Sequence, residues 1–336
     1  MTHKTAYLIG CFFLFVLIVL PGTPMAAAPY YEGKVLTIIV GYPPGGGYDR
    51  VARFLANHLP KYIPGKPSIV VQNMPGASSM IAGNHLYNVA KPDGLTILAT
   101  QRGLAFMELL KVEGVKFNVS KFTYIGSAAA ESNVFCIRAD LPYKTIQDLL
   151  KSKQLLYIGV DSPTSVTAQT THLGKDFMGM NIKIVDYRGT PEILLAIERK
   201  EADGLWFAYN SARPHIERGL LRALVRSWVS LKGIENLPIN EDLTTDPIGK
   251  ALMGMLGRSA VMGRPYLAPP GVPANIANIL RDAFAKMLAD PQIQKESEKA
   301  QMELSYASAE ECVKLMNYLM EQPPDVVKAF AKYVKF

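Results

Sequence analysis

A short strand that runs into consecutive glycines constrains this chain more than any other feature. Residues 35–49 read VLTIIVGYPPGGGYD, a β-branched apolar run followed by prolines, three glycines and an acidic residue. We predict a strand, a binding loop at Gly45, Gly46 and Gly47, and a helix whose N-cap is Asp49. Glycines let a ligand approach the main chain, and the start of a helix presents unpaired N–H groups and the positive end of the helix dipole. The segment therefore predicts an anion-binding site.

Nucleotide-binding patterns do not fit this loop. A P-loop needs Lys followed by Ser or Thr after its last glycine, where Tyr48 and Asp49 stand, and the G-x-G-x-x-G spacing is absent. A glycine-rich turn that only joins a strand to a helix is an alternative to a binding loop. The rest of the chain must decide between them.

The amino terminus has the pattern of a secretory signal peptide. A sparse basic start precedes an apolar stretch over residues 6–20 and small residues at 26–28. We predict a signal peptide over residues 1–28 and a periplasmic mature protein, because no later stretch is long and apolar enough to span a membrane. The segment LIGC also resembles a lipoprotein cleavage box, so lipidation of Cys11 is an alternative.

Composition and charge limit the partners that we expect. The chain has 336 residues and 49% hydrophobic content, enough for two cores of ordinary domain size. Its net charge of +7 is spread without a basic run, so we predict no nucleic-acid partner and only a weak positive field for anionic solutes. Cys136 and Cys312 lie far apart in the sequence, which predicts buried free thiols.

Strand and helix signals alternate at about 30 residues per unit, which is typical of parallel βαβ layouts. The first series has further strands over 68–72 and 95–100. Because ligands favour the carboxyl ends of such strands, Gln101 and Arg102 become candidate site residues beside the glycine loop. The sequence thus predicts an α/β layer with its site at one sheet edge.

A second α/β series follows from about residue 133. Its strand over 155–159 leads directly into a hydroxyl-rich loop, which would supply O–H and N–H donors to an anion. The candidate residues of this loop are Ser162, Thr164 and Ser165. Further along, we predict Thr190 as the N-cap of one helix and Pro214 as the start of another. A helix-rich tail then implies that the chain returns to the first domain.

Catalytic motifs are absent from the sequence. It contains no G-x-S-x-G, S-x-x-K or H-E-x-x-H segment, and its mature histidines, His58, His85, His172 and His215, stand at no metal-ligand spacing. We predict no catalytic residues, no metal and no cofactor. Catalytic groups that only folding brings together are the alternative.

Five segments, in this order and spacing, resemble the extracytoplasmic solute receptors of tripartite tricarboxylate transporters, also called Bug-type receptors. They are residues 42–49, 73–77, 91–96, 187–190 and 268–273. The resemblance covers essentially the whole mature chain. It implies an α/β, two-lobed type II periplasmic-binding-protein fold, in which each lobe is a mixed, mainly parallel sheet flanked by helices. Lobe 1 would comprise residues 29–129 and 231–336, and lobe 2 residues 130–230.

The resemblance also implies a function. Such a receptor captures a small organic carboxylate between its lobes, as a monomer, and delivers it to the membrane permease subunits of its transporter. The ligand would be held by main-chain amides, hydroxyls and water at the two loops, with Asn210 at an equivalent strand end. Carried over from the family, the ligand-binding residues would be Gly45, Gly46, Gly47 and Asp49 of the first loop and Ser162, Thr164 and Ser165 of the second. The second loop lacks the family's usual glycines, and Arg102 or Arg188 could engage a second carboxylate. A secreted enzyme or a ligand-sensing module on the same bilobal fold is the alternative.

Overall fold

The first lobe is built on a six-stranded sheet with the strand order β11-β4-β10-β3-β1-β2. The computed structural model describes residues 28–160, 166–187, 189–300 and 302–334. The strands are β1 Val35–Val40, β2 Ser68–Asn73, β3 Thr96–Ala99, β4 Thr123–Ser127, β10 Pro265–Ala268 and β11 Ala307–Ser308. β1 pairs in parallel with β2 and β3, whereas β10 is antiparallel to β3 and β4. The sheet is therefore mixed.

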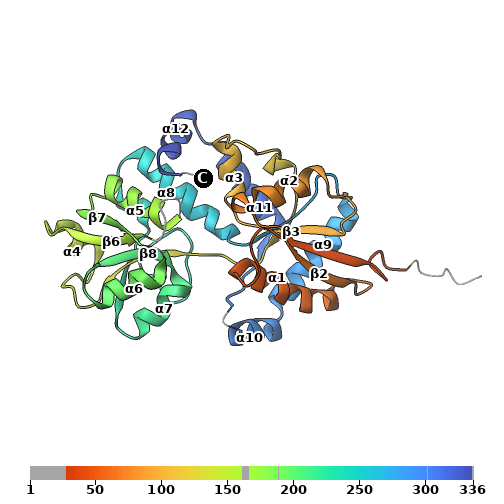
Figure 1. The fold of residues 1–336 in the computed structure, drawn as a ribbon, viewed down its shortest axis with the longest axis horizontal. Coiled ribbons are helices and arrows are strands. Elements are labelled where there is room, and N and C mark those ends of the chain that lie inside the picture. Colours follow the sequence, from red (N-terminus) through yellow and green to blue (C-terminus); the bar gives the residue numbers. More distant parts are fainter. Residues whose placement is uncertain (1–27, 161–165, 188, 301, 335–336) are drawn as a thin grey trace, which may run out of the picture.

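The second lobe is built on a five-stranded sheet with the order β7-β6-β8-β5-β9. Its strands are β5 Asn133–Arg138, β6 Leu156–Val160, β7 Ile182–Asp186, β8 Gly204–Ala208 and β9 Leu221–Arg226. β6 is parallel to β7 and β8, and β5 is antiparallel to both of its neighbours. The predicted two-lobed α/β fold with mixed sheets is confirmed, and Figure 1 shows the lobes beside each other.

Helices cover both faces of each sheet because strand side chains alternate between the faces. In β1, Leu36, Ile38 and Val40 join one apolar cluster, while Ile39 joins another on the opposite face. The helices of the first lobe are α1 Gly47–His58, α2 Met80–Asn88, α3 Leu104–Leu109, α9 Ala274–Ala289, α10 Pro291–Lys299 and α11 Ala309–Met320. Those of the second are α4 Ile146–Lys151, α5 Val166–Phe177, α6 Thr190–Glu198 and α7 Tyr209–Glu217.

Two helices link the lobes. α8 (Pro247–Ser259) packs against α5 of the second lobe and against α11 and α12, and α12 (Pro324–Tyr333) also contacts α5. Figure 1 shows α8, in cyan, between the two sheets. One cluster of buried residues contains Phe106 and Phe330 on one side and Phe135 and Trp206 on the other. An apolar core is therefore shared between the lobes.

Two helix starts differ from the predictions. Thr190 is the first residue of α6 rather than its N-cap, which is Gly189. α7 begins at Tyr209, so Pro214 lies inside the helix instead of starting it. Because proline has no N–H, the carbonyl of Asn210 loses its helical partner four residues on. The caps of two other helices are as the local sequence favours, with Thr145 and Ser308 side chains accepting from main-chain N–H groups.

Both cysteines of the described chain are free and buried, as predicted. Burial raises the pKa of the Cys312 thiol to about 12. The predicted signal peptide, apart from residue 28, and Cys11 lie outside the described residues. Within those residues, every helix is too short or too polar to cross a bilayer.

The chain passes between the lobes in two crossover segments, residues 128–132 and 260–264, that lie side by side. The Glu131 N–H donates to the Ala260 carbonyl at 2.9 Å, and the Ala128 N–H donates to the Arg264 carbonyl at 3.0 Å. A Cβ at Gly263 would lie 2.8 Å from the carbonyl oxygen of Ala129. The close approach of the two segments therefore depends on glycine at position 263.

Gly263→Ala should destabilise the protein because its Cβ would push the crossover segments apart. We expect the free energy of unfolding, measured by urea denaturation, to fall by about 1–3 kcal/mol. Gly46→Ala is the matched control, since its Cβ would meet only the Pro43 carbonyl oxygen, at 3.7 Å. The control should change stability by less than about 0.5 kcal/mol. Equal stability of Gly263→Ala and the wild type would contradict this account.

Candidate anion-binding site

Three loops of the first lobe end at one level of its sheet. Val40, the last residue of β1, pairs with Asn73 of β2 and with Ala99 of β3. The loops that follow these strands therefore begin side by side. Hydrogen bonds join them: the Asn73 amide donates to the Tyr42 carbonyl at 2.9 Å, and the Gln101 amide donates to the Ser78 carbonyl at 3.0 Å. The predicted site residue Gln101 thus ties two loops together.

The glycine loop exposes its main chain. Gly45, Gly46 and Gly47 are all exposed, and Gly45 has a φ of +85°, which glycine adopts without strain. A Cβ at Gly45 would meet no atom within 4 Å. α1 begins at Gly47, so the first N–H groups of this helix have no partner inside it. These donors lie where a small anion can approach them.

Asp49 is not the N-cap, contrary to the prediction. Gly46 is the N-cap and Asp49 is the third residue of α1, because the glycines already adopt the helix start. The Asp49 carboxylate accepts from the Gly45 N–H at 2.8 Å, the Arg53 Nε at 2.9 Å and the Asn73 amide at 2.9 Å. These hydrogen bonds, that of Arg53 foremost, lower the pKa of the buried Asp49 carboxyl to about 2. The hydrogen bonds of Asp49 therefore hold the glycine loop against α1 and β2.

Asp49→Asn should lower stability in a pH-dependent way. The native carboxyl has a pKa of about 2, below the value of about 3.9 expected when unfolded, so its stabilisation is complete above about pH 5 and lost as pH falls toward 2. We expect the free energy of unfolding of the variant to be lower than that of the wild type by about 1–3 kcal/mol at pH 7. Urea denaturation at several pH values should show the gap to wild type closing toward pH 2. A gap that is constant with pH would contradict the assignment.

Two stacked tyrosines connect the glycine loop to a crossover segment. The rings of Tyr42 and Tyr48 lie 4.6 Å apart at an interplanar angle of 12°. The Tyr48 hydroxyl donates to the Gly263 carbonyl at 3.3 Å. Burial raises the pKa of Tyr48 to about 12, so this phenol is a neutral donor at physiological pH. The loop is thereby joined to the segment through which the chain returns from the second lobe.

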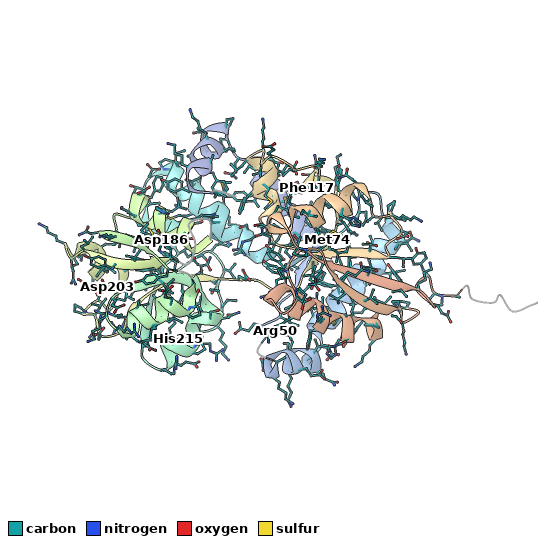
Figure 2. All side chains as sticks on the ribbon, in the orientation of Figure 1. Arg50, Met74, Phe117, Asp186, Asp203 and His215 are labelled. Atoms are coloured by element: carbon teal, nitrogen blue, oxygen red, sulfur yellow. The ribbon has the colours of Figure 1, made fainter. Side chains whose placement is uncertain are left out.

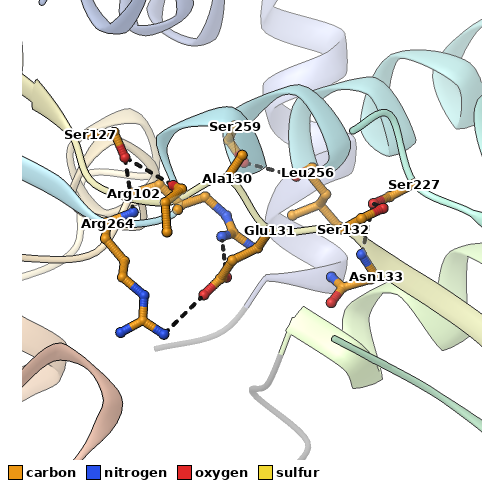
Figure 3. A network of polar contacts seen from close by, with 12 residues as sticks. Arg102, Ser127, Ala130, Glu131, Ser132, Asn133, Ser227, Leu256, Ser259 and Arg264 are labelled. Carbon is orange, nitrogen blue, oxygen red and sulfur yellow. Dashed lines mark hydrogen bonds and ion pairs between the residues drawn. The ribbon is translucent and has the colours of Figure 1, made fainter. Parts of the chain in front are cut away.

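A cluster of charged side chains, Arg102, Glu131 and Arg264, lies near Tyr48, and Figure 3 shows this cluster. Arg102 follows β3 and is only 7% exposed, and its Nη1 lies 2.9 Å from Oε2 of Glu131. Arg264, just before β10, has its Nη2 3.9 Å from Oε1 of the same Glu131 and also donates to the Gly47 carbonyl. Arg102, predicted as a candidate for a ligand carboxylate, therefore already contacts a carboxylate of the chain itself.

The strand ends of both lobes meet at the crossovers. β4 runs in the same direction as β1 and β3, and the chain leaves for the second lobe from its carboxyl end. β9 likewise runs with β6, β7 and β8, and Ser227, directly after it, accepts from the N–H of Asn133 at 2.9 Å. Arg50 of α1, labelled in Figure 2, lies on the side of the first lobe that faces the second. The carboxyl edges of the two sheets therefore face one interlobe region.

The second-lobe candidates are only partly described. Ser162, Thr164, Ser165 and Arg188 lie outside the described residues. The strands that precede them, β6 and β7, end together, with Val160 paired to Asp186. Asn210 is exposed in the first turn of α7, at the carboxyl end of β8. The described residues contain no group of three or more His, Cys, Asp and Glu side chains that could hold a metal ion.

Two α/β lobes whose strand ends face each other across paired crossover segments define the two-lobed fold of periplasmic binding proteins. The chain matches TctC, the tripartite tricarboxylate transporter family receptor, over residues 51–331, and it belongs to this family. A UPF0065 protein of Bordetella pertussis is 27% identical over 269 residues, which are 77% of each chain.

Solved structures share the fold. A TctC solute-binding protein from Polaromonas, without ligand, superposes with a TM-score of 0.73 at 21% identity and covers 90% of this chain and 100% of its own. MatC of Rhodopseudomonas palustris, with bound malate, gives 0.58 at 18% identity and 88% and 99% coverage. Another R. palustris protein, with adipate, gives 0.61 at 20% identity and 90% and 98% coverage.

Proposed function

We propose that this protein is a periplasmic receptor that closes around a small organic carboxylate. It would deliver the ligand to the membrane permease subunits of a tripartite tricarboxylate-type transporter. The observation that carries the proposal is the exposed glycine loop at the start of α1, whose first N–H groups have no partner inside the helix. In the proposal these N–H groups face the interlobe region. Membership of the receptor family supports the role, and the malate and adipate of two similar structures support a carboxylate ligand.

In this proposal both lobes contribute to binding. The main-chain N–H groups of Gly46 and Gly47 hold a carboxylate from the first lobe, while Ser162, Thr164 and Ser165 supply donors from the second. Asn210, in the first turn of α7 after β8, would add a further polar group from the second lobe, and Arg188 is proposed to contribute a positive charge. A ligand that contacts both lobes favours the closed state over the open one, because only the closed state makes all contacts at once. The receptor would act as a monomer.

Isothermal titration with a panel of mono-, di- and tricarboxylates tests the proposal. Saturable binding of at least one carboxylate, which is recovered chemically unchanged, is the expected result. Mass spectrometry of ligand that co-purifies with the protein would guide the choice of panel. Steady conversion of a bound carboxylate into another compound would instead favour an enzyme on the same fold and contradict the receptor.

Gly46→Val should abolish carboxylate binding and leave the fold intact. A side chain at position 46 projects into open space, with the Pro43 carbonyl oxygen 3.7 Å from its Cβ as the nearest neighbour, so valine fills the approach to the N–H groups. We expect the affinity for the tightest panel ligand to fall at least about 100-fold, while cooperative thermal unfolding persists. Gly46→Ala should give an intermediate loss. Unchanged affinity in Gly46→Val would show that the ligand binds elsewhere.

A further inference from the structure

Glu131 places a carboxylate between two guanidinium groups at the point where the chain leaves the first lobe. Its side chain is 29% exposed, against 7% for Arg102 and 23% for Arg264. The contact with Arg102, at 2.9 Å, is a charge-assisted hydrogen bond, and the contact with Arg264, at 3.9 Å, is an ion pair. Figure 3 shows the two arginines on either side of the Glu131 carboxylate.

The position of Glu131 is fixed by its main chain as well as by its side chain. Its N–H donates to Ala260 at 2.9 Å, and the next residue, Ser132, donates its hydroxyl to the Val229 carbonyl at 2.7 Å. A Cβ at Gly263 would lie 2.9 Å from the Glu131 Cγ, so this side chain also packs closely against the second crossover segment. The carboxylate is therefore a charge held in one place.

This charge lies next to the glycine loop. Arg264 donates to the Gly47 carbonyl, and its guanidinium carbon lies 5.2 Å from the centre of the Tyr48 ring. A Cβ at Gly47 would come within 3.2 Å of both terminal nitrogens of Arg264. An anion bound at the N–H groups of the loop would therefore interact electrostatically with the net charge of Arg102, Glu131 and Arg264.

The cluster carries one uncompensated positive charge. Two guanidinium groups face the single Glu131 carboxylate, and the nearby Asp49 and Arg53 form an ion pair that adds no net charge. Without Glu131 the same cluster would carry two positive charges. A change at this one residue would alter the electrostatics of the site while sparing the N–H donors of the loop.

We propose that Glu131 is a specificity-determining residue, which selects ligands by their number of negative charges. It does so by cancelling one of the two guanidinium charges beside the site. The inference rests on the proposed carboxylate site at the glycine loop and adds to it a residue that need not touch the ligand. In the wild type, the remaining positive charge favours a ligand with one negative group beyond the carboxylate at the loop. Removal of the Glu131 charge should strengthen the preference for the more highly charged ligand.

The test compares the Kd of adipate with that of hexanoate, which has the same carbon chain length and one carboxylate fewer. If another dicarboxylate of the panel binds more tightly, it is compared with its own methyl-ended analogue. Glu131→Gln keeps the shape and one acceptor oxygen for Arg102, and should raise the ratio of the monocarboxylate Kd to the dicarboxylate Kd about tenfold at low salt. Glu131→Asp keeps the charge and should leave the ratio within about twofold of wild type. Arg264→Gln should lower the ratio.

Each outcome separates charge from structure. If Glu131 had only a structural role, its substitution would weaken the binding of both ligands equally. The ratio of the two Kd values would then change little in both the Gln and the Asp variant, and this result would overturn the inference. The effect of Glu131→Gln should also shrink as ionic strength rises, because the added charge is partly exposed. If the wild type binds carboxylates and Gly46→Val abolishes binding, an unchanged ratio in Glu131→Gln contradicts this inference alone. Binding of no carboxylate by the wild type contradicts the proposed function, and this inference with it.

Discussion

The hydrogen bonds of the buried Asp49 carboxylate hold the proposed site in shape. A glycine loop has few conformational restraints of its own, so something must fix it if its N–H groups are to point one way. Asp49 is 2% exposed, and its carboxylate accepts hydrogen bonds from the N–H of Gly45, the side chain of Arg53 and the side-chain amide of Asn73. The loop, α1 and β2 are thereby fastened at one point, while the next N–H groups of the helix stay unpaired within it. Organisation of the main chain in this way lowers the entropic cost of ordering it around a ligand.

The second constraint is the junction between the lobes. Two hydrogen-bonded crossover segments and the helices α8 and α12 connect the sheets, and the apolar cluster that they share extends from Phe106 to Trp206. Packed apolar contacts resist gradual deformation, so we expect lobe closure to proceed by rotation about the crossovers. Glu131 and Arg264 lie on these segments and contact the first-lobe loops. In the proposed function, ligand recognition and lobe movement would therefore involve the same short stretches of chain.

The sequence predicts most strands but fewer of the contacts that build the site. β1 and β2 follow from β-branched runs bounded by turn residues, and α9 from its amphipathic period. The sequence does not indicate α8, because prolines interrupt the pattern between residues 228 and 273 and the three glycines of the helix disfavour it. Tertiary packing against α5 and α12 overrides that local preference. The ion pairs of Glu131 cannot be predicted from the sequence for another reason. Arg102 and Arg264 lie 29 and 133 residues away from Glu131, and no sequence motif indicates that they are in contact. The glycine loop can be predicted as a candidate site because its residues are adjacent in the sequence.

The most direct test of the central claim is a crystal structure of the protein with the tightest carboxylate of the panel. We expect a ligand carboxylate between the lobes, with its oxygens about 3 Å from main-chain nitrogens in residues 46–48. We also expect Asp49 to keep its hydrogen bonds to Gly45 and Arg53 in that complex. A carboxylate bound elsewhere, with the glycine loop facing only solvent, would contradict the account.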